Sequence, residues 1–596
     1  MNGRAFFLIG LFLALFFSCK ETSQSVTEGD YTYTDDGIIY AGQKSDEVVV
    51  QVVAQPASLH PTNGRTRVRD RILDLISQEL IDLDVRTGKM VPILIKELPV
   101  LSDDGTQFSI ELDPDAKWPD GKSIDAEDIL FSYKAAACPL TNNPAQKGYG
   151  EYLKNIVPDP SNPLKVNFLF SEYYINNLDM LSVFQIMDKR VYDPQGLLDA
   201  YSVQDMYEDA SVEKDPDVIA WAEEFNDAKY NKEKEYINSA SGPYMLEEWI
   251  DEQMIILKKR DNYWGDAKES YYDHATPPKI TFKFLRDADA LELQLAGEEI
   301  DVAEMGTESF KRLLEDELVG KNYRLESKER ATFVSLPLNH KPTSAGRPPF
   351  FTDKKVRQAV SYALPIEEMI TAFVGDERFA LRVGSPVSQM SPDYNSNLSF
   401  YKHDPEKAKQ LLDEAGWIDS DGDLIRDKEI NGQKVDFEFS MVYPANNQTL
   451  VGFANKIKEE LAKVGITCNP DGVTGRVVQQ KLWTHDYDMG MLALGSSHLP
   501  YDFHQLFYSQ NWPEGDNIYG FANEEADDLI LKSRTESDEA KRKVMVNRIQ
   551  EILYEEKPCI FLYAPTKKLA IHKRFNGAET YSIIDHLILN DFKVIR

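Results

Sequence analysis

Histidine, serine and acidic residues occur in this chain without the spacing that common catalytic sites require. The nine histidines include no H-E-x-x-H pair, and His498 and His504 have no recognised spacing for metal ligands. Gly495-Ser496-Ser497 lacks the final glycine of a G-x-S-x-G nucleophile elbow. A glycine-rich phosphate loop is also missing from the sequence. We therefore predict a protein that is not an enzyme and has no catalytic residues, no metal ligands and no cofactor.

One acidic segment resembles part of a calcium loop. Asp419-Ser420-Asp421-Gly422-Asp423 alternates carboxylates, but its glycine is misplaced and no glutamate stands at the expected distance. We interpret the segment as an acidic turn that follows Trp417. A weak calcium site on the surface is the alternative.

Two arginines in one short loop have the chemistry to bind a carboxylate. The loop reads Asn63-Gly64-Arg65-Thr66-Arg67, and a guanidinium can hold a carboxylate through two parallel hydrogen bonds. A solvated basic loop that pairs with an acidic surface explains the same residues equally well. The position of the loop in the fold decides between these interpretations.

Length and charge restrict the class of protein. A chain of 596 residues can form two or three domains, each with a full core. The net charge of −33 would repel nucleic acid, which we therefore exclude as a partner. Solubility at a crowded surface is the simplest explanation of this acidity.

The first 18 residues read as a signal peptide. Arg4 supplies the positive charge, and the apolar run from Ala5 to Phe17 is too short to span a membrane as a stable helix. Cys19 directly follows a small residue, as in a bacterial lipobox, and would become the lipidated first residue of the mature protein. An ordinary signal peptide with an incidental cysteine is the alternative, but no A-x-A-like site precedes the polar region.

The segment that follows reads as a flexible tether. Residues 19–45 are polar and show little apolar periodicity. No second segment has the length needed to cross a bilayer. We therefore predict a lipid-anchored protein on the periplasmic face of a bacterial cell envelope.

Three cysteines remain beyond Cys19. Cys138, Cys468 and Cys559 lie far apart, and an odd number cannot all pair within one chain. They predict either one disulfide with a buried thiol or three buried thiols, because none has the spacing of a metal site.

The apolar residues of the chain alternate between the periods of strands and of helices. The β-branched run over residues 47–54 predicts a strand, and residues 125–136 place apolar side chains on one helix face. Further strands are predicted over residues 254–258 and 279–285, and further helices over residues 69–80, 354–363, 406–415, 451–464 and 540–555. Asp353 can cap one of these helices, and Gly416 can end another. This alternation predicts α/β layers with a mixed sheet.

Residues 195–240 differ from the rest of the chain. They are acidic, prone to form helices and weakly apolar. We interpret them as a surface insertion whose acidic run is a solvated face.

Seven short motifs follow one another along the chain. They are Ala57 to Pro61, Trp118 to Ser132, Gly242-Pro243-Tyr244, Asn262-Tyr263-Trp264, Gly297 to Asp301, Pro349 to Ala359 and Leu411 to Trp417. In type and order they resemble the motifs of the family 5 extracellular solute-binding proteins, the capture subunits of ABC-type oligopeptide and dipeptide importers. The resemblance covers residues 46–596, with His60 in place of the usual aspartate. We expect these motifs to form turns and core rather than to touch the ligand.

The resemblance implies a fold and a division into domains. The fold would be α/β, of the two-lobed periplasmic-binding-protein type (type II, cluster C), with a small extra domain inserted in the first lobe. Lobe I would comprise residues 46–79, 236–305 and 563–596. The inserted domain would be residues 80–235, and lobe II residues 306–562. Hinge closure of the lobes would enclose the ligand.

The resemblance also implies a function and partners. A monomer would capture a peptide or peptide-like solute and deliver it to an inner-membrane ABC permease with its ATPase. The same scaffold could instead bind a non-peptide solute such as a metal chelate, a sugar or an opine. A glycan-binding surface lipoprotein is a third reading, but the helical repeats expected there are missing.

Relatives in this family suggest which residues hold the ligand. The loop with Arg65, Thr66 and Arg67 reaches the cleft in relatives. Tyr149 aligns with a tyrosine that lines the cleft of oligopeptide binders, although core packing explains it too. Such sites hold an extended peptide mainly by backbone hydrogen bonds and leave few marks in the sequence.

Residues 487–503 depart from the peptide-binding pattern. Peptide binders often carry an aspartate after a similar strand, and it pairs with the amino terminus of the peptide. Ser496 and Ser497 occupy that place here, and the first aspartate available is Asp502. A serine hydroxyl cannot supply the charge-assisted bond that an ammonium group prefers. Either Asp502 substitutes, or the ligand lacks a free amino terminus.

Overall fold

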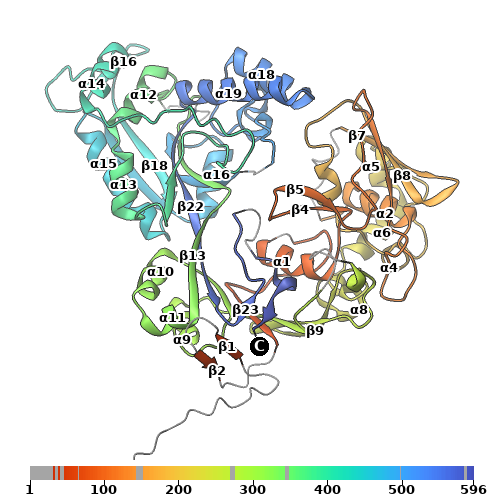
Figure 1. Cartoon of the computed structure of the whole chain (residues 1–596). Helices are drawn as coiled ribbons and strands as arrows, with labels where there is room; N and C mark the ends of the chain where they lie inside the picture. The colour runs from red at the N-terminus through yellow and green to blue at the C-terminus, as the bar shows by residue number, and fades with distance from the viewer. Residues whose placement is uncertain are drawn as a thin grey trace, which may run out of the picture.

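The computed structural model describes residues 46–64, 66–142, 152–268, 275–341, 348–496, 499–582 and 587–595, together with the backbone of two short strands, β1 (Tyr31–Tyr33) and β2 (Ile38–Tyr40). Cys19, Arg65, Tyr149 and Ser497 lie outside the described residues. Figure 1 shows two lobes, with a third body beside the first lobe. The predicted two-lobed α/β fold is confirmed.

A mixed sheet of ten strands runs through both lobes. Its main path is β21 (Leu492–Gly495), β14 (Thr332–Pro337), β22 (Cys559–His572), β12 (Val302–Met305), β3 (Val48–Val52), β11 (Lys279–Phe284), β10 (Met254–Lys259) and β9 (Tyr244–Ile250). β13 (Tyr323–Glu329) and β15 (Ala380–Arg382) also pair with β22. β3 is parallel to both β11 and β12, and it confirms the strand predicted over residues 47–54.

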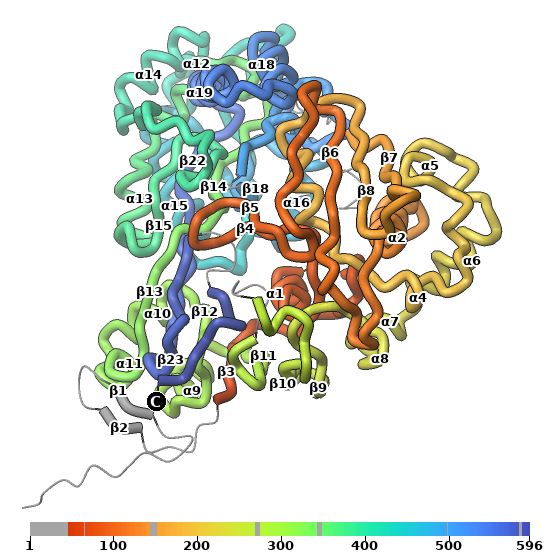
Figure 2. The backbone as a smooth tube through the Cα atoms, turned by 45° about the vertical axis from the view of Figure 1, so that its right-hand side comes forward, coloured from red at the N-terminus to blue at the C-terminus, as the bar shows by residue number. Residues whose placement is uncertain are grey.

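Strand β22 belongs to both lobes. Its first half pairs with β14 and β15, and its second half pairs with β12 and β13. The chain also crosses between the lobes where β13 ends at Glu329 and β14 begins at Thr332. Figure 2 shows β22 and β13 side by side between the lobes. A few residues at the ends of such strands can absorb the rotation of hinge closure.

Several helices of the described residues pack against the first-lobe part of the sheet. They are α1 (Arg67–Ile76), α9 (Ala288–Ala296), α10 (Thr307–Leu314) and α11 (Glu317–Asn322), and the short strands β23 (Phe575–Asn576) and β24 (Lys593–Val594) lie near the C-terminus. Both α10 and α11 contact α9. The ranges of the three domains stay a prediction. These contacts favour a crossover to the second lobe near Arg330 rather than at residue 306.

The third body is built on a small antiparallel sheet. It contains β6 (Gln107–Glu111), β8 (Asn162–Phe170) and β7 (Leu153–Asp159), the hairpin of β4 (Ile81–Asp84) and β5 (Lys89–Pro92), and helix α2 (Ala126–Ala137). Asp125 and Asp128 form a capping box at the start of α2. Trp118 Nε1 donates to Asp128 Oδ2 at 2.9 Å, so the Trp118 to Ser132 motif connects a turn to a helix start.

Residues 195–240 form the predicted helices and expose much of their acidic run, but they also bury aromatic residues in a core that their weakly apolar sequence did not predict. The region, with the helix just before it, holds α4 (Lys189–Tyr192), α5 (Val203–Glu208), α6 (Pro216–Phe225), α7 (Lys229–Lys232) and α8 (Lys234–Ile237). Trp221 and Phe225 are buried and stack with ring centroids 4.6 Å apart, and Trp221 also contacts Phe131 of α2. Because the helices are short, their apolar residues form a core without a long helical period.

The second lobe confirms the helices predicted for it. Its helices are α12 (Lys354–Ala363), α13 (Ile366–Phe373), α14 (Pro405–Glu414), α15 (Gln448–Ala462), α16 (Gly475–Trp483), α17 (His504–Phe507), α18 (Glu524–Thr535) and α19 (Glu539–Glu556). Its smaller strands are β16 (Asp427–Ile430), β17 (Gln433–Asp436), β18 (Glu438–Pro444), β19 (Thr467–Val473) and β20 (Met489–Gly490). Asp353 caps α12, and Gly416 follows α14 with a φ of +80°.

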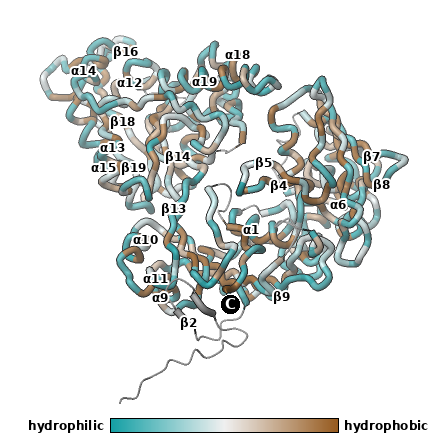
Figure 3. The backbone as a smooth tube through the Cα atoms, viewed as in Figure 1, coloured by the Kyte–Doolittle hydropathy of each residue, from teal (hydrophilic) through white to brown (hydrophobic). Residues whose placement is uncertain are grey.

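The interior of the molecule is apolar and contains three thiols, which is the second of the two predicted alternatives for the cysteines. Figure 3 shows hydrophobic segments along the strands and hydrophilic segments in many outer turns. Cys138, Cys468 and Cys559 are buried and unbridged. Burial raises the pKa of the Cys468 and Cys559 thiols to about 12. Within the described part of the chain, no helix combines the length and apolarity needed to cross a membrane.

Candidate ligand-binding cleft

A cavity of about 360 Å³ lies where the first lobe meets the strands that join the lobes. It is lined by the carboxyl end of β3, the first turns of α1, the junction of β12 with α10, and Arg330 and Lys567 of the crossover. Because ligands of α/β proteins bind beyond the carboxyl ends of parallel strands, this cavity is the candidate ligand-binding site.

Positive charge dominates the lining of this cavity. Arg67, Arg71, Arg330 and Lys567 are among the lining residues, and Glu304 brings a carboxylate. Glu304 Oε2 lies 3.4 Å from Lys567 Nζ, so this carboxylate is already paired. The charge balance favours a ligand with a negatively charged group.

The structure places part of the predicted arginine loop in the cavity. Arg67 lines it, whereas Thr66 caps α1, with its side chain accepting from Arg69 N at 3.3 Å. Arg71, which sequence reasoning missed, follows Arg67 by four residues and therefore lies on the same helix face. This four-residue spacing from Arg67 is a sequence signal that would identify Arg71 as a second cation beside the cavity. Lys567 comes from a distant strand and has no such signal.

The predicted residues of the 487–503 segment make contacts within the protein. Ser496 Oγ donates to Pro386 O at 2.6 Å and accepts from Ser388 N at 3.0 Å. Asp502 Oδ2 accepts from Tyr174 Oη and from Arg534 Nε, each at 3.0 Å. The structure therefore does not bring Ser496 and Asp502 together with Arg67.

Asp502 belongs to a cluster between the third body and the second lobe. We call Tyr152, Tyr174, Asp502 and Arg534 the interdomain cluster. The two tyrosine rings stack 4.4 Å apart, and the Arg534 guanidinium lies 5.1 Å and 5.3 Å from their centroids. Ile175 N also donates to Arg534 O at 3.0 Å. Burial, followed by the charge of Asp502, raises the pKa of Tyr174 well above its usual range, so its hydroxyl keeps its proton.

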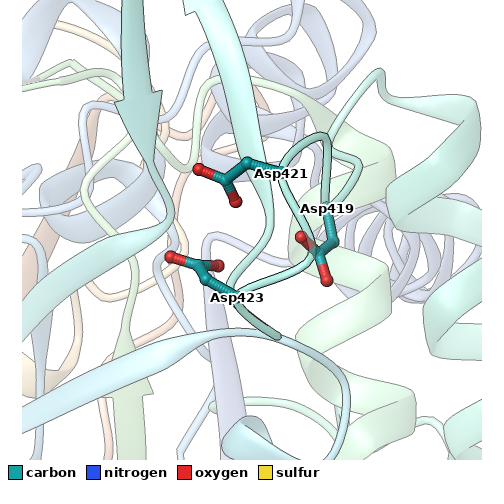
Figure 4. Close-up of side chains that lie close together, drawn as sticks. All are labelled: Asp419, Asp421 and Asp423. Atoms are coloured by element: carbon teal, nitrogen blue, oxygen red, sulfur yellow. The ribbon is translucent and has the colours of Figure 1, made fainter.

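The acidic segment after Trp417 forms an exposed turn. Figure 4 shows the side chains of Asp419, Asp421 and Asp423, whose oxygens lie within 4.8 Å of one another. Lys434 Nζ forms an ion pair with Asp421 and lies 3.6 Å from Asp427 Oδ2. A lysine thus provides positive charge beside this cluster, and both the acidic turn and the weak calcium site stay predictions.

Comparison with known sequences matches most of the chain to one family. The family described as "Bacterial extracellular solute-binding proteins, family 5 Middle" matches residues 89–514. The chain belongs to this family. The family 5 protein is therefore a solute-binding protein, and its family consists of binding components of transporters rather than of enzymes.

Known relatives cover almost the whole of this family 5 protein. The oligopeptide-binding protein AppA of Bacillus subtilis (strain 168) is 25% identical over 545 residues, which is 90% of this chain and 89% of AppA. The structure of B. subtilis AppA in complex with a nonapeptide has a TM-score of 0.68 at 22% identity, covering 92% of this chain and 99% of that one. NikZ from Campylobacter jejuni in complex with Ni(L-His) has a TM-score of 0.70 at 23% identity, with coverage of 92% and 99%. These structures confirm the fold.

His60 of the family 5 protein fixes the loop before α1. Its Nδ1 accepts from the backbone N–H groups of Thr62 at 3.1 Å and Asn63 at 3.2 Å. Its Nε2 therefore carries the proton and donates to Phe225 O at 2.9 Å. An aspartate at this place could accept the same two bonds but could not donate to Phe225. Burial lowers the pKa of His60 to about 3.

His60 should make the protein sensitive to mild acid. The unfolded chain protonates His60 near pH 6.5, whereas the folded protein keeps it neutral down to about pH 3. The contribution of neutral His60 to stability is therefore complete above pH 6.5 and is lost progressively as the pH falls toward 3. At pH 5 the loss should be about 2 kcal/mol. Urea titrations of the wild type and His60→Asn at pH 7.5 and 5 measure this loss. Equal pH dependence of the two proteins would contradict it.

Proposed function

We propose that this family 5 protein captures a peptide or peptide-like solute between its lobes and delivers it to an inner-membrane ABC permease that works with an ATPase. The observation that carries this proposal is the cavity of about 360 Å³ at the crossover of the lobes. Closure about the crossover strands would enclose a solute there. The oligopeptide-binding relative AppA supports a peptide as the solute.

A non-peptide solute is the second candidate function. The cationic lining suits any small molecule with carboxylate groups. The relative NikZ was solved with Ni(L-His), and this supports a small chelate as an alternative. The two candidates share the same site and the same mode of capture.

We further propose that the mature protein is a monomer anchored by lipid at Cys19 on the periplasmic face of the envelope. The lipobox-like sequence at Ser18-Cys19 supports this anchor. A tether over residues 19–45 would let the lobes reach the permease.

For the ligand itself, we propose that Arg67 and its neighbour Arg65 contact a carboxylate and that Tyr149, Ser496 and Ser497 lie along the cleft. The contacts of Asp502 with Arg534 and Tyr174 favour a ligand whose amino terminus is not held by this aspartate. Peptides with a free and with a blocked amino terminus should then bind alike.

A thermal-shift screen of peptide libraries tests the proposed function. The purified protein without residues 1–19 should be strongly stabilised by some short peptides, because a ligand that binds only the folded state raises its stability. Mass spectrometry of co-purified ligand would identify the natural solute class. Indifference to free and blocked peptides alike would refute the peptide reading, and stabilisation by chelates alone would select the second candidate.

A further inference from the structure

Arg71 forms no ion pair with the described residues of the protein. Arg71 is nine-tenths buried in the second turn of α1, and it lines the cavity. Among the described residues, its Nε and Nη2 have no hydrogen-bond partner. A guanidinium carries five donors and stays charged at any physiological pH. An uncompensated buried charge of this kind is costly, so its retention needs a reason.

The neighbouring arginine shows how the same helix satisfies a buried guanidinium. Arg69 Nε donates to His60 O at 3.0 Å, and its Nη1 forms an ion pair with Asp70 at 2.5 Å. Arg69 therefore has a structural role in holding the loop before α1. Arg71 faces the cavity and makes no comparable contact with the described residues.

A second part of the cavity lining also favours an anion. Helix α10 follows Gly306, which offers no side-chain cap, and a side-chain carbon at Gly306 would meet nothing within 4 Å. Gly306 itself lines the cavity, so the positive end of α10 opens toward the same space. Glu304 already forms an ion pair with Lys567, and it does not pair with Arg71.

We infer that Arg71 binds a carboxylate group of the solute, with Arg67 beside it, so that the transported solutes are carboxylic acids anchored at the carboxyl end of β3. This inference rests on the proposed function, and it adds the chemical class of the ligand. A carboxylate at this point would supply the missing counter-ion through charge-assisted, bidentate bonds. The carboxylate can come from the carboxyl terminus of a peptide, from an acidic side chain or from a non-peptide acid.

Three pairs of probes distinguish these sources. The first pair, tri- to pentapeptides as free acids and as carboxyl-terminal amides, tests the carboxyl terminus. The second pair, amidated peptides with Glu or with Gln, tests an acidic side chain. The third pair, tricarballylate and its triamide, tests a non-peptide acid. Calorimetry should show that wild type binds the acid of at least one pair about 10- to 100-fold more tightly than its amide. Arg71→Gln should reduce the affinity for that acid to the affinity for the amide. The affinity of Arg71→Lys for that acid should lie between those of wild type and Arg71→Gln, because lysine keeps the positive charge but cannot form two parallel hydrogen bonds to one carboxylate.

Stability without ligand provides an independent readout. Since Arg71→Gln removes an uncompensated buried charge, its thermal midpoint without ligand should equal or exceed that of wild type. Arg548→Gln is the matched control, because Arg548 is a surface arginine paired with Glu525. That variant should bind the acids as wild type does.

The outcomes separate this inference from the proposed function. Equal binding of acid and amide by wild type, or unchanged acid binding by Arg71→Gln, overturns the carboxylate contact while solute capture stands. A large loss of ligand-free stability in Arg71→Gln also overturns it, because Arg71 would then be structural. Failure of every acid and amide to bind contradicts both the inference and the proposed function.

Discussion

Replacing Asp301 with alanine should lower the free energy of unfolding by about 3 to 5 kcal/mol, because it leaves the buried guanidinium of Arg574 without its counter-ion. Arg574 Nε and Nη2 each donate to a carboxylate oxygen of Asp301 at 2.7 Å, and both side chains are almost fully buried. Asp301 Oδ2 also accepts from Val49 N at 2.8 Å. The carboxylate thus connects β3, the start of β12 and the chain just after β22.

Urea denaturation followed by tryptophan fluorescence measures this loss. Asp289→Ala is the control, because that side chain is 92% exposed and should change stability by less than about 0.5 kcal/mol. Removing both charges, with Asp301→Leu and Arg574→Met, should recover part of the loss. If Asp301→Ala unfolds like Asp289→Ala, the ion pair does not stabilise the first lobe.

Sequence reasoning predicts the parts of this fold that depend on neighbours in the chain. The strand over residues 47–54 is predictable because four of the five residues of β3 are valine, as expected where both sides of a strand are covered. Gly121 and Gly416 have φ of +83° and +80°, which residues with a side chain rarely adopt. The Gly297 to Asp301 motif is recognisable from its pattern, although Arg574, the buried partner of Asp301, lies 273 residues away.

The candidate site is only partly predictable from local patterns in the sequence. Arg67 is predictable because it stands in a basic loop, and Arg71 follows from the helical spacing. Lys567 reaches the cavity only because β22 crosses between the lobes. Tyr174 meets Asp502 across 328 residues of chain, so the role of that aspartate in domain contact was not accessible from the sequence.

Asp502→Ala should weaken the binding of every solute, whether or not it has a free amino terminus. In a two-lobed binding protein, contacts made only in the closed arrangement add to the observed affinity. The interdomain cluster joins the third body to the second lobe, with Asp502 accepting from both Tyr174 and Arg534 at 3.0 Å. Losing bonds to a charged group costs about 1.5 to 3 kcal/mol, which is about a 10- to 100-fold loss of affinity.

Tyr174→Phe removes one hydrogen bond of the interdomain cluster and keeps the stacking of the two rings. It should therefore reduce the affinity for solutes about 2- to 10-fold. Calorimetry with free and amino-blocked peptides measures the affinities of both variants. Asp528→Ala is the control, because Asp528 pairs with Lys532 on the exposed side of α18.

The pattern of affinity loss decides what Asp502 does. A loss shared by free and blocked peptides assigns it to closure of the lobes. A loss confined to free peptides would instead assign it to the amino terminus of the ligand, since only that group would miss its carboxylate. Tyr174→Phe strengthens this distinction, because it leaves the Asp502 carboxylate in place and removes only the hydroxyl that bonds to Asp502 and to Asn176.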